Sequence, residues 1–389
     1  MIHSELLKQS STINVIYYIG KLPGYGHIKE GGAQLVLQHL VEKLIVNQPK
    51  YKPEILVQHG REKNSNNTLP VTPHMHLDDL INHLRRNNHP KTILHLADSQ
   101  LLLYHPEYLH VVASFWKGHI VQRLTQLDRI NSLKSKIPNG LSDHLNQISM
   151  FVSQSDEITK VLTELEVSPE KITQISNGVD TNIFFPSRTS EEKNLIRQKL
   201  FPVITNDKLI YYYVGRLSSH KKRVVDLFHA WKNSKLFEDG HFLNLIGSYD
   251  EGIPEINDIK SLKKVGIILS GLVPHNLIAE YNRASDVFIL PTVPEGEGFS
   301  NAILEAQACG LPIICRKGVS GSNKVVFQNQ TGLFFEDVDG LTSDLVAMKN
   351  RTNRSRMAKN ALNHTHSSFT LEIMAKNHFE LYERLLRNN

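Results

Sequence analysis

The chain has few cysteines, no long apolar run and no low-complexity tract, and each absence excludes a class of protein. Only two cysteines, Cys309 and Cys315, occur among 389 residues. Both lie in apolar segments, so we expect buried thiols rather than a disulfide. No apolar run approaches the ~20 residues that span a bilayer. The first residues, MIHSELLKQSS, lack the basic-then-apolar order of a signal peptide. These features predict a cytoplasmic protein.

Length and composition fit an ordinary globular protein of two domains. A chain of 389 residues is too long for one typical domain. Its 40% hydrophobic and 21% charged residues argue against a disordered or fibrous class. The net charge is +5, and the basic clusters at 85–86 and 221–223 are either solvated faces or contacts to phosphates and anionic membrane surfaces. The histidines are scattered without a ligand pattern, and we expect neither a metal site nor a nucleic-acid partner.

Strand-like and helix-like segments alternate along the chain, which predicts parallel sheets built from crossover units. Two doubly wound domains of this kind place ligands at the carboxyl ends of their strands. Polar residues between 177 and 207 predict a connection between the domains. The expected strands are 13–20, 55–58, 92–96, 111–115, 148–152, 172–175, 208–215, 242–246, 265–269, 286–290, 313–315 and 332–335. The expected helices include 33–46, 225–231 and 371–386.

The stretch 291–312, PTVPEGEGFSNAILEAQACGLP, predicts an anion site. It follows a short buried strand, and its glycines allow a tight turn. Ser300 or Asn301 can then cap a helix that runs from Ala302 onward. A strand that turns directly into a helix presents backbone N–H groups above the sheet. These donors and the helix dipole favour a bound anion.

Two carboxylates in the same stretch indicate that the ligand also carries hydroxyl groups. Glu297 and Glu305 stand eight residues apart, one at the start of the expected helix and one about a turn into it. A carboxylate at an anion site is unfavourable unless it accepts hydrogen bonds, as it would from a sugar or a ribose. A phosphate combined with a polyol suggests a nucleotide sugar.

This arrangement resembles the E-x7-E motif of retaining glycosyltransferases of the GT-B fold, in glycosyltransferase family 4, the glycosyl transferases group 1. The run EGFSNAILEAQACGLPII is similar to that family's EGFG, EA and G-x-P-V/I pattern. The resemblance implies two Rossmann-like, doubly wound domains that face each other across a cleft. Residues 1–185 would bind the acceptor and residues 186–370 the nucleotide sugar. Residues 371–389 would form a helix that crosses back to the N-terminal domain.

The segment VGRLSSHKKRVVDL, just past an expected strand, carries candidate phosphate-binding cations. Two fixed cations at a strand end can hold a pyrophosphate and neutralise its growing charge. The segment resembles the family's G-R-L-x-x-x-K-G element, which implies that Gly215 and Arg216 lie at the donor diphosphate. Lys221 fits the spacing of the family's lysine. However, Lys222 stands where the family has glycine, and one extra residue precedes Asp226, so Lys222 is the alternative.

The resemblance also implies roles for the motif helix and its preceding turn. Glu297 would bind hydroxyls of the donor sugar, and Glu305 would bind those of the ribose. Backbone N–H groups would contact sugar or phosphate oxygens over four successive residues, Gly298, Phe299, Ser300 and Asn301. Arg216, Lys221 and Glu297 are therefore the expected catalytic residues.

Three elements of the first half resemble the family less closely. Gly31 and Gly32 match its glycine-rich first loop, which approaches phosphates or the transferred sugar; the alternative is an ordinary turn. Many relatives place a histidine at the end of an N-domain strand. Here the expected strand 111–115 has His119 slightly later, either as a substitute that binds substrate or as an ordinary loop residue. Asn177, in ISNGVDTNIFFP, is either structural or a substrate contact.

The resemblance implies a retaining, metal-independent glycosyltransferase. It would transfer a sugar from a UDP- or GDP-sugar to a glycan or lipid-linked acceptor in bacterial cell-surface polysaccharide or lipopolysaccharide synthesis, with no cofactor besides this donor. Such an enzyme would be cytoplasmic, with a peripheral contact at the inner, anionic face of the membrane. The D-x-D at 337–339 is interpreted as an acidic turn, without Mg²⁺. The alternatives are a GT-B sugar-nucleotide epimerase and a noncatalytic carbohydrate-binding module. A dehydrogenase is disfavoured because the glycines of GYGHIKEGG do not fit G-x-G-x-x-G.

Overall fold

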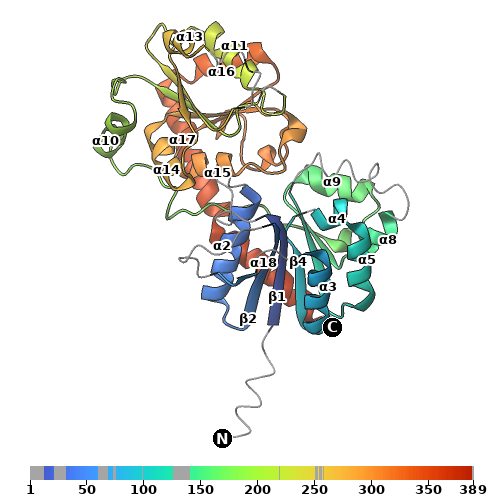
Figure 1. The fold of residues 1–389 in the computed structure, drawn as a ribbon. Helices are drawn as coiled ribbons and strands as arrows, with labels where there is room; N and C mark the ends of the chain where they lie inside the picture. The colour runs from blue at the N-terminus through green and yellow to red at the C-terminus, as the bar shows by residue number, and fades with distance from the viewer. Residues whose placement is uncertain are drawn as a thin grey trace, which may run out of the picture. The chain divides into compact units, whose positions relative to one another are not determined.

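The chain divides into two compact units (Figure 1). Unit 1 comprises Met1–Asn177 and Leu371–Asn389, and unit 2 comprises Gly178–Thr370. The division therefore falls at residue 177, whereas the sequence predicts residue 185. Just after it, the Val179 N–H donates to the Phe369 carbonyl within unit 2 (2.9 Å). The structure, a computed structural model, describes residues 13–21, 32–59, 69–72, 76–98, 100–125, 141–218, 220–249, 253, 256 and 258–387.

Unit 1 is built on a parallel sheet with the strand order β3-β2-β1-β4-β5-β6-β7. Its strands are β1 (Ile13–Lys21), β2 (Tyr51–His59), β3 (Val71–Thr72), β4 (Thr92–Leu96), β5 (His119–Leu124), β6 (Met150–Ser153) and β7 (Ile172–Gln174). Its helices are α2 (Gly32–Asn47), α3 (Leu77–Arg86), α4 (Gln100–Tyr104), α5 (Pro106–Phe115), α8 (Leu141–Asn146) and α9 (Asp156–Glu164), with a 3-10 turn, η2 (Pro169–Lys171). Alternate residues of β1 contribute to two hydrophobic clusters, one on each face, as expected for a buried parallel strand.

The last helix of the chain, α18 (Leu371–Arg387), completes unit 1 by packing beside α2. The Tyr382 hydroxyl lies 3.1 Å from the Tyr17 hydroxyl of β1 and 2.6 Å from Nδ1 of His95 in β4. Burial holds the pKa of His95 well below its ordinary value, so the imidazole stays neutral. This polar cluster therefore fixes the terminal helix on the sheet.

Unit 2 is a second parallel sheet, with the strand order β10-β9-β8-β11-β12-β13. Its strands are β8 (Ile210–Val214), β9 (Phe242–Ile246), β10 (Ile267–Gly271), β11 (Val287–Leu290), β12 (Ile313–Arg316) and β13 (Gly332–Phe335). From β8 to β10 the strands are added toward one edge of the sheet, and from β11 to β13 toward the other. The order of addition therefore reverses between the neighbouring parallel strands β8 and β11. The carboxyl ends of these two strands form the topological switch point, where open α/β sheets bind their ligands.

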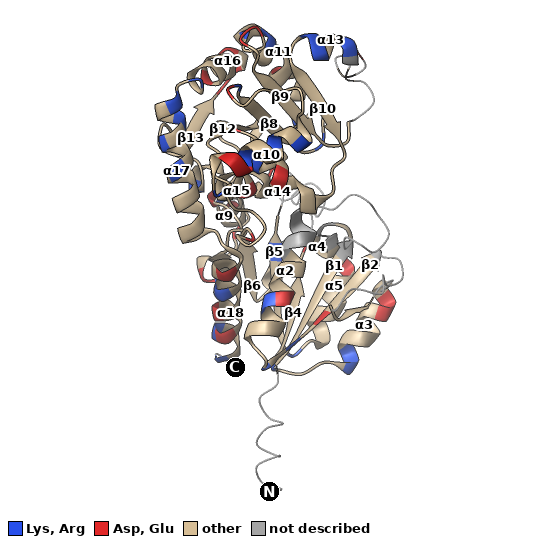
Figure 2. Ribbon diagram, turned by 90° about the vertical axis from the view of Figure 1, so that its left-hand side faces the viewer, with Lys and Arg blue, Asp and Glu red and all other residues tan. Residues whose placement is uncertain are grey.

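The helices of unit 2 surround this sheet, and basic residues recur along α13 and α17 (Figure 2). They are α10 (Ser190–Leu200), α11 (Val224–Ser234), α13 (Ile259–Lys264), α14 (His275–Ala284), α15 (Asn301–Ala308), α16 (Val338–Ala347) and α17 (Arg351–Ser368), with the 3-10 turns η3 (Pro294–Gly296) and η4 (Ser322–Lys324). The acidic turn at 337–339 begins α16, since Asp337 accepts a capping hydrogen bond from Gly340 N–H (2.7 Å). Cys309 and Cys315 are buried free thiols, as predicted.

Two local predictions are wrong. The expected strand 111–115 is the second half of α5, because Pro106 opens a helix whose Leu109 and Val112 are buried on one face. The expected connection 177–207 contains α10. Its N-cap Thr189 accepts a hydrogen bond from Glu192 N–H (3.2 Å), a capping arrangement that stabilises a helix start.

Candidate active site

The loop after β8 begins with a close approach between two strand ends. Gly215 has a φ of 152°, and a Cβ at Gly247, after β9, would lie 1.8 Å from the Gly215 carbonyl oxygen. Only glycine fits at Gly247 without a shift of the backbone. The Tyr213 hydroxyl donates to the Arg216 carbonyl (2.9 Å), which fixes the backbone at the first expected cation. The Arg216 side chain is exposed at the carboxyl end of β8.

The loops after β8 and β11 are joined at the switch point. The Val293 N–H donates to the Lys221 carbonyl (3.0 Å). One residue further, Lys222 forms an ion pair with Glu297, and each side chain of the pair is only 21% exposed. The structure therefore brings a cation of the first loop, Lys222, to a carboxylate of the second.

Backbone geometry favours Lys222 over Lys221 as the counterpart of the family's lysine. In the G-R-L-x-x-x-K-G element the lysine precedes glycine, the residue that tolerates positive φ. Here the left-handed residue is Arg223, with a φ of 50°, directly after Lys222 and at the start of α11. Its guanidinium pairs with Asp226 (2.9 Å), which also pairs with Arg316 (2.6 Å). This geometry favours an alignment in which the extra residue of this chain lies before Lys222, whereas the spacing favours Lys221; the choice between them stays a prediction.

The loop after β12 contacts and stabilises the turn from Glu297 to α15. Ser320 Oγ donates to the Gly298 carbonyl (2.9 Å). Phe299 is buried, and a Cβ at Gly321, whose φ is 72°, would lie 2.5 Å from the Phe299 ring. The Phe299 side chain therefore belongs to the core, and this residue has only its backbone to offer a ligand.

Helix α15 begins at Asn301, with Ser300 at its N-cap position. The expected side-chain cap from Ser300 is not formed with any residue that the structure describes. The N–H groups at the start of a helix need an acceptor from elsewhere when a side-chain cap is missing. An anion above the sheet would supply one.

Glu305 lies one turn into α15, as predicted, and contacts a histidine that the sequence analysis missed. His275 Nε2 lies 2.9 Å from Glu305 Oε1, and the His275 ring packs against Phe184 with centroids 5.6 Å apart. His275 is the first residue of α14 and follows the carboxyl end of β10 by a short loop. That position past a strand end is the signal that could have identified it.

The structure does not place His119 at the ligand-binding edge of its sheet. His119 is the first residue of β5, so it lies at the amino end of the strand. The carboxyl end of β5 is Leu124, followed by Thr125 rather than a histidine. Burial lowers the pKa of His119, and the Leu385 carbonyl of α18 opposes this shift. The structure therefore favours the alternative of an ordinary residue for His119, because the expected strand 111–115, on which the substrate contact rested, is part of α5.

Two other expectations of unit 1 have simple outcomes. Gly31 lies outside the described residues, and Gly32 begins α2. The Asn177 side-chain oxygen accepts from the Arg123 guanidinium (2.6 Å), and both residues are buried. Burial lowers the pKa of Arg123 to about 10. The geometry supports the structural interpretation of Asn177.

The two doubly wound units define the fold as GT-B. The crystal structure of Anabaena Alr3699/HepE in complex with UDP and glucose matches 95% of this chain and 99% of that one, with a TM-score of 0.72 and 15% identity. Residues 208–350 match the family of glycosyl transferases group 1. The resemblance seen in the sequence is thus confirmed over this part of the chain.

Two curated relatives extend the comparison. The chain is 30% identical over 219 residues to UDP-Gal:alpha-D-GlcNAc-diphosphoundecaprenol alpha-1,3-galactosyltransferase of Escherichia coli, covering 54% of this chain and 53% of that protein. It is 24% identical over 243 residues to N,N'-diacetylbacillosaminyl-diphospho-undecaprenol alpha-1,3-N-acetylgalactosaminyltransferase of Campylobacter jejuni, covering 61% of each. The matches thus span about half to three fifths of these relatives. In the described residues, no helix combines the length and apolar character needed to cross a membrane.

Proposed function

We propose that this protein is a retaining glycosyltransferase that transfers a sugar from a nucleoside-diphosphate sugar to a glycan or lipid-linked acceptor. The observation that carries the proposal is the joining of two loops at one switch point. The loop after β8 brings Arg216 and Lys222, and the loop after β11 brings Glu297. Glu305 follows one turn later in α15. Cations for a diphosphate and carboxylates for hydroxyls thus belong to one sheet edge.

Each group has a role that its chemistry suits. Arg216 and Lys222 would hold the diphosphate and neutralise the charge that develops as it leaves. The first N–H groups of α15 would add donors to the same oxygens. Glu305, oriented by His275, would accept from the ribose hydroxyls, and Glu297 would accept from those of the sugar. When the donor binds, Lys222 would exchange part of its contact with Glu297 for a phosphate oxygen.

The relatives support a particular donor and acceptor. The Anabaena structure contains UDP and glucose, and the E. coli relative is named for UDP-Gal. A UDP-sugar is therefore the first donor to test, and a GDP-sugar the second. Both curated relatives are named for diphosphoundecaprenol-linked acceptors. We expect a lipid-linked acceptor, contacts to it from unit 1, and work in cell-surface polysaccharide or lipopolysaccharide synthesis at the cytoplasmic face of the membrane.

Metal independence and retention are part of the proposal. The side-chain cations would do electrostatically what a divalent ion does in other transferases, so activity should survive excess EDTA. Full loss of activity with EDTA, restored by Mg²⁺ or Mn²⁺, would contradict this part. A phosphate oxygen of the leaving group would deprotonate the acceptor on the face it leaves, which retains the anomeric configuration. Proton NMR of the product distinguishes retention from inversion.

A product assay tests the function itself. Nucleotide sugars are first screened by thermal shift, since a ligand at ~100 times its dissociation constant stabilises a protein by ~2.7 kcal/mol. The best donor is then incubated with diphosphoundecaprenol-linked sugars, and the nucleoside diphosphate and the elongated lipid are quantified together. A transferase forms both in equal amounts. An epimerase converts the donor without an acceptor, and a noncatalytic module forms neither product.

A further inference from the structure

A cavity lies at the edge of the unit 2 sheet opposite the proposed donor site. It has a volume of about 480 Å³ and is lined by the start of α10, the ends of α14 and α15, and the first half of α17. Asp286, in its wall, directly precedes β11, and its N–H donates to the carbonyl of Ile210, the first residue of β8 (2.9 Å). The cavity is therefore at the amino ends of the strands, whereas the proposed donor site is at their carboxyl ends.

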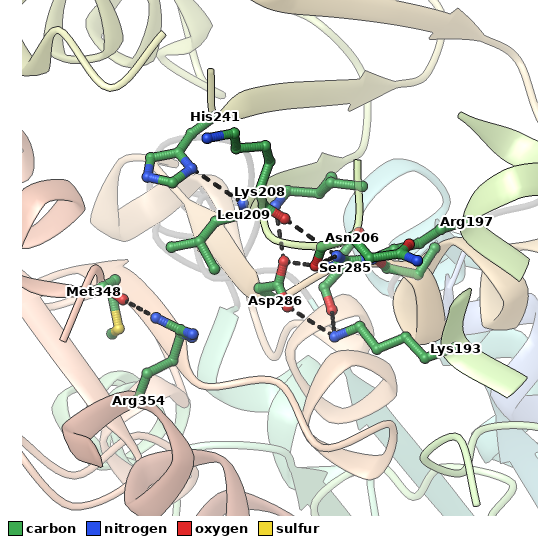
Figure 3. A network of polar contacts seen from close by, with 12 residues as sticks. Lys193, Arg197, Asn206, Lys208, Leu209, His241, Ser285, Asp286, Met348 and Arg354 are labelled. Atoms are coloured by element: carbon green, nitrogen blue, oxygen red, sulfur yellow. Dashed lines mark hydrogen bonds and ion pairs between the residues drawn. The ribbon is translucent and has the colours of Figure 1, made fainter. Parts of the chain in front are cut away.

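The lining is strongly basic. Four cationic residues, Arg188, Lys193, Arg283 and Arg354, face one carboxylate, Asp286. That carboxylate is already engaged: it pairs with Lys193 (2.8 Å) and with a buried arginine of α10, and it accepts from the Ile210 N–H (2.8 Å) (Figure 3). Asp286 therefore cannot balance the other three cations of the lining. An unbalanced group of cations around a concave site favours a bound anion.

Two donors of the lining lack acceptors among the described residues. Arg283 Nε and Ser187 Oγ are buried and have no hydrogen-bond partner there. The Arg283 guanidinium instead lies 4.6 Å from the centre of the Phe185 ring. A guanidinium is only ever a donor, so what this wall lacks is an acceptor. Buried polar groups in native proteins are nearly always satisfied.

The contacts of the other two arginines of the lining, Arg354 and Arg188, also leave room for a bound anion in the cavity. One nitrogen of Arg354 donates to the Met348 and Lys349 carbonyls (2.6 and 3.2 Å), which fixes the side chain at the end of α16. Arg188 engages the described part of the chain through its backbone, whose N–H donates to Glu192 (2.7 Å). Its exposed guanidinium forms no hydrogen bond or ion pair with a described residue, so it is available for a ligand.

We propose that this cavity binds a phosphate group of a small polyanion, as a second anion site separate from the donor site. Guanidinium groups match phosphate oxygens in paired hydrogen bonds, and three of the four lining cations are arginines. The volume lies within the range of small-molecule sites and exceeds the needs of a single phosphate. The phosphate group belongs either to a soluble molecule or to a lipid headgroup.

Calorimetric titration with inorganic pyrophosphate tests the site in the full-length protein. The experiment uses an Arg216→Gln background, which weakens binding at the donor edge. Pyrophosphate should still bind this variant, and a further Arg283→Gln change should lower the affinity by roughly tenfold or more, because charge-assisted hydrogen bonds are lost. Adding Arg188→Gln instead should also weaken binding. Lys359→Gln, an exposed change of the same charge on α17, should have no effect.

The outcomes separate the proposal from loss of folding and from its two ligand sources. The Arg188 side chain forms no hydrogen bond or ion pair with a described residue, so Arg188→Gln should fold normally. This variant therefore still tests the site if Arg283→Gln does not fold. Equal pyrophosphate affinity in the background, Arg188→Gln and Arg283→Gln proteins would overturn the proposal, as would no binding at all. Vesicles of phosphatidylcholine with phosphatidic acid distinguish the sources. If the same substitutions reduce the amount of protein that sediments with the vesicles, the ligand is a lipid headgroup. If they abolish pyrophosphate binding but leave sedimentation with the vesicles unchanged, the ligand is a soluble molecule.

Discussion

Lys222 should carry the second positive charge of the diphosphate site, and Lys222→Met should show it. The side chain is 21% exposed and pairs with Glu297, so its charge acts in a partly dehydrated environment. The substitution keeps most of the aliphatic stem and removes the ammonium group. Loss of a charge-assisted hydrogen bond costs about 1.5–3 kcal/mol. Affinity for the bare nucleoside diphosphate should therefore fall by roughly 10- to 100-fold.

Lys221→Met is the matched control, because it removes the same charge one residue earlier. The contact that holds this loop to Val293 runs from the Lys221 backbone carbonyl and survives the substitution. Affinity should stay within about twofold of the native protein. Calorimetric titration with UDP, at equal ionic strength for all proteins, measures both effects.

The pairing with Glu297 requires one more protein, the double variant with Glu297→Gln. If Lys222 acts directly on the diphosphate, its substitution should weaken UDP binding in the native and in the Glu297→Gln background alike. A tenfold loss in Lys221→Met together with native-like affinity in Lys222→Met would refute the reasoning. It would show that spacing, rather than the left-handed residue Arg223, locates the phosphate-binding lysine.

Three further predictions use other contacts of unit 2. Glu305→Gln should weaken binding of the bare nucleoside diphosphate roughly tenfold, whereas Glu297→Gln should largely spare that binding but reduce sugar transfer. Calorimetry measures the binding and the product assay measures the transfer; the reverse pattern would exchange the roles of the two glutamates. Gly321→Ala should lower the free energy of unfolding by about 2 kcal/mol in urea, since its Cβ would overlap the Phe299 ring at a left-handed φ; an unchanged midpoint would contradict this. Burial raises the pKa of the half-buried Asp344 from 3.8 to about 6, whereas the unfolded chain keeps the lower pKa. The ionised carboxylate therefore lowers the free energy of unfolding above pH 6 and has no effect on it below pH 3.8. Asp344→Asn should thus stabilise by about 1 kcal/mol at pH 7, discounted for partial exposure, and by nothing near pH 4; an equal gain at both pH values would exclude the titration.

The buried strands could be predicted because each is a short apolar run with polar boundaries. The expected strands 242–246 and 332–335 coincide with β9 and β13. The run 111–115 failed because five apolar or small residues fit a strand and a helix equally well. What decides for α5 is Pro106 at its first turn and the packing of Leu109 and Val112 against the sheet, which involves residues far away in the chain.

The candidate site could be predicted where a side chain follows a strand end directly. Arg216 after β8 is of this kind, whereas Glu297 follows β11 only after the turn η3, and both glutamates were identified from the motif in which they stand. The preference for Lys222 rests on the positive φ of Arg223, which the sequence alone does not reveal. His275 reaches Glu305 from another helix, so only the folded structure brings the two together.

Binding of a nucleotide sugar at the ends of β8 and β11 is the central claim, and one calorimetric series tests it most directly. UDP-sugars and GDP-sugars are titrated into the native protein, Arg216→Gln and a control, Lys232→Gln, whose exposed charge lies on α11. The account predicts that at least one donor binds the native and control proteins equally, and binds Arg216→Gln at least tenfold more weakly. Equal affinity for all three proteins, or no binding of any nucleotide sugar to the native protein, would contradict it.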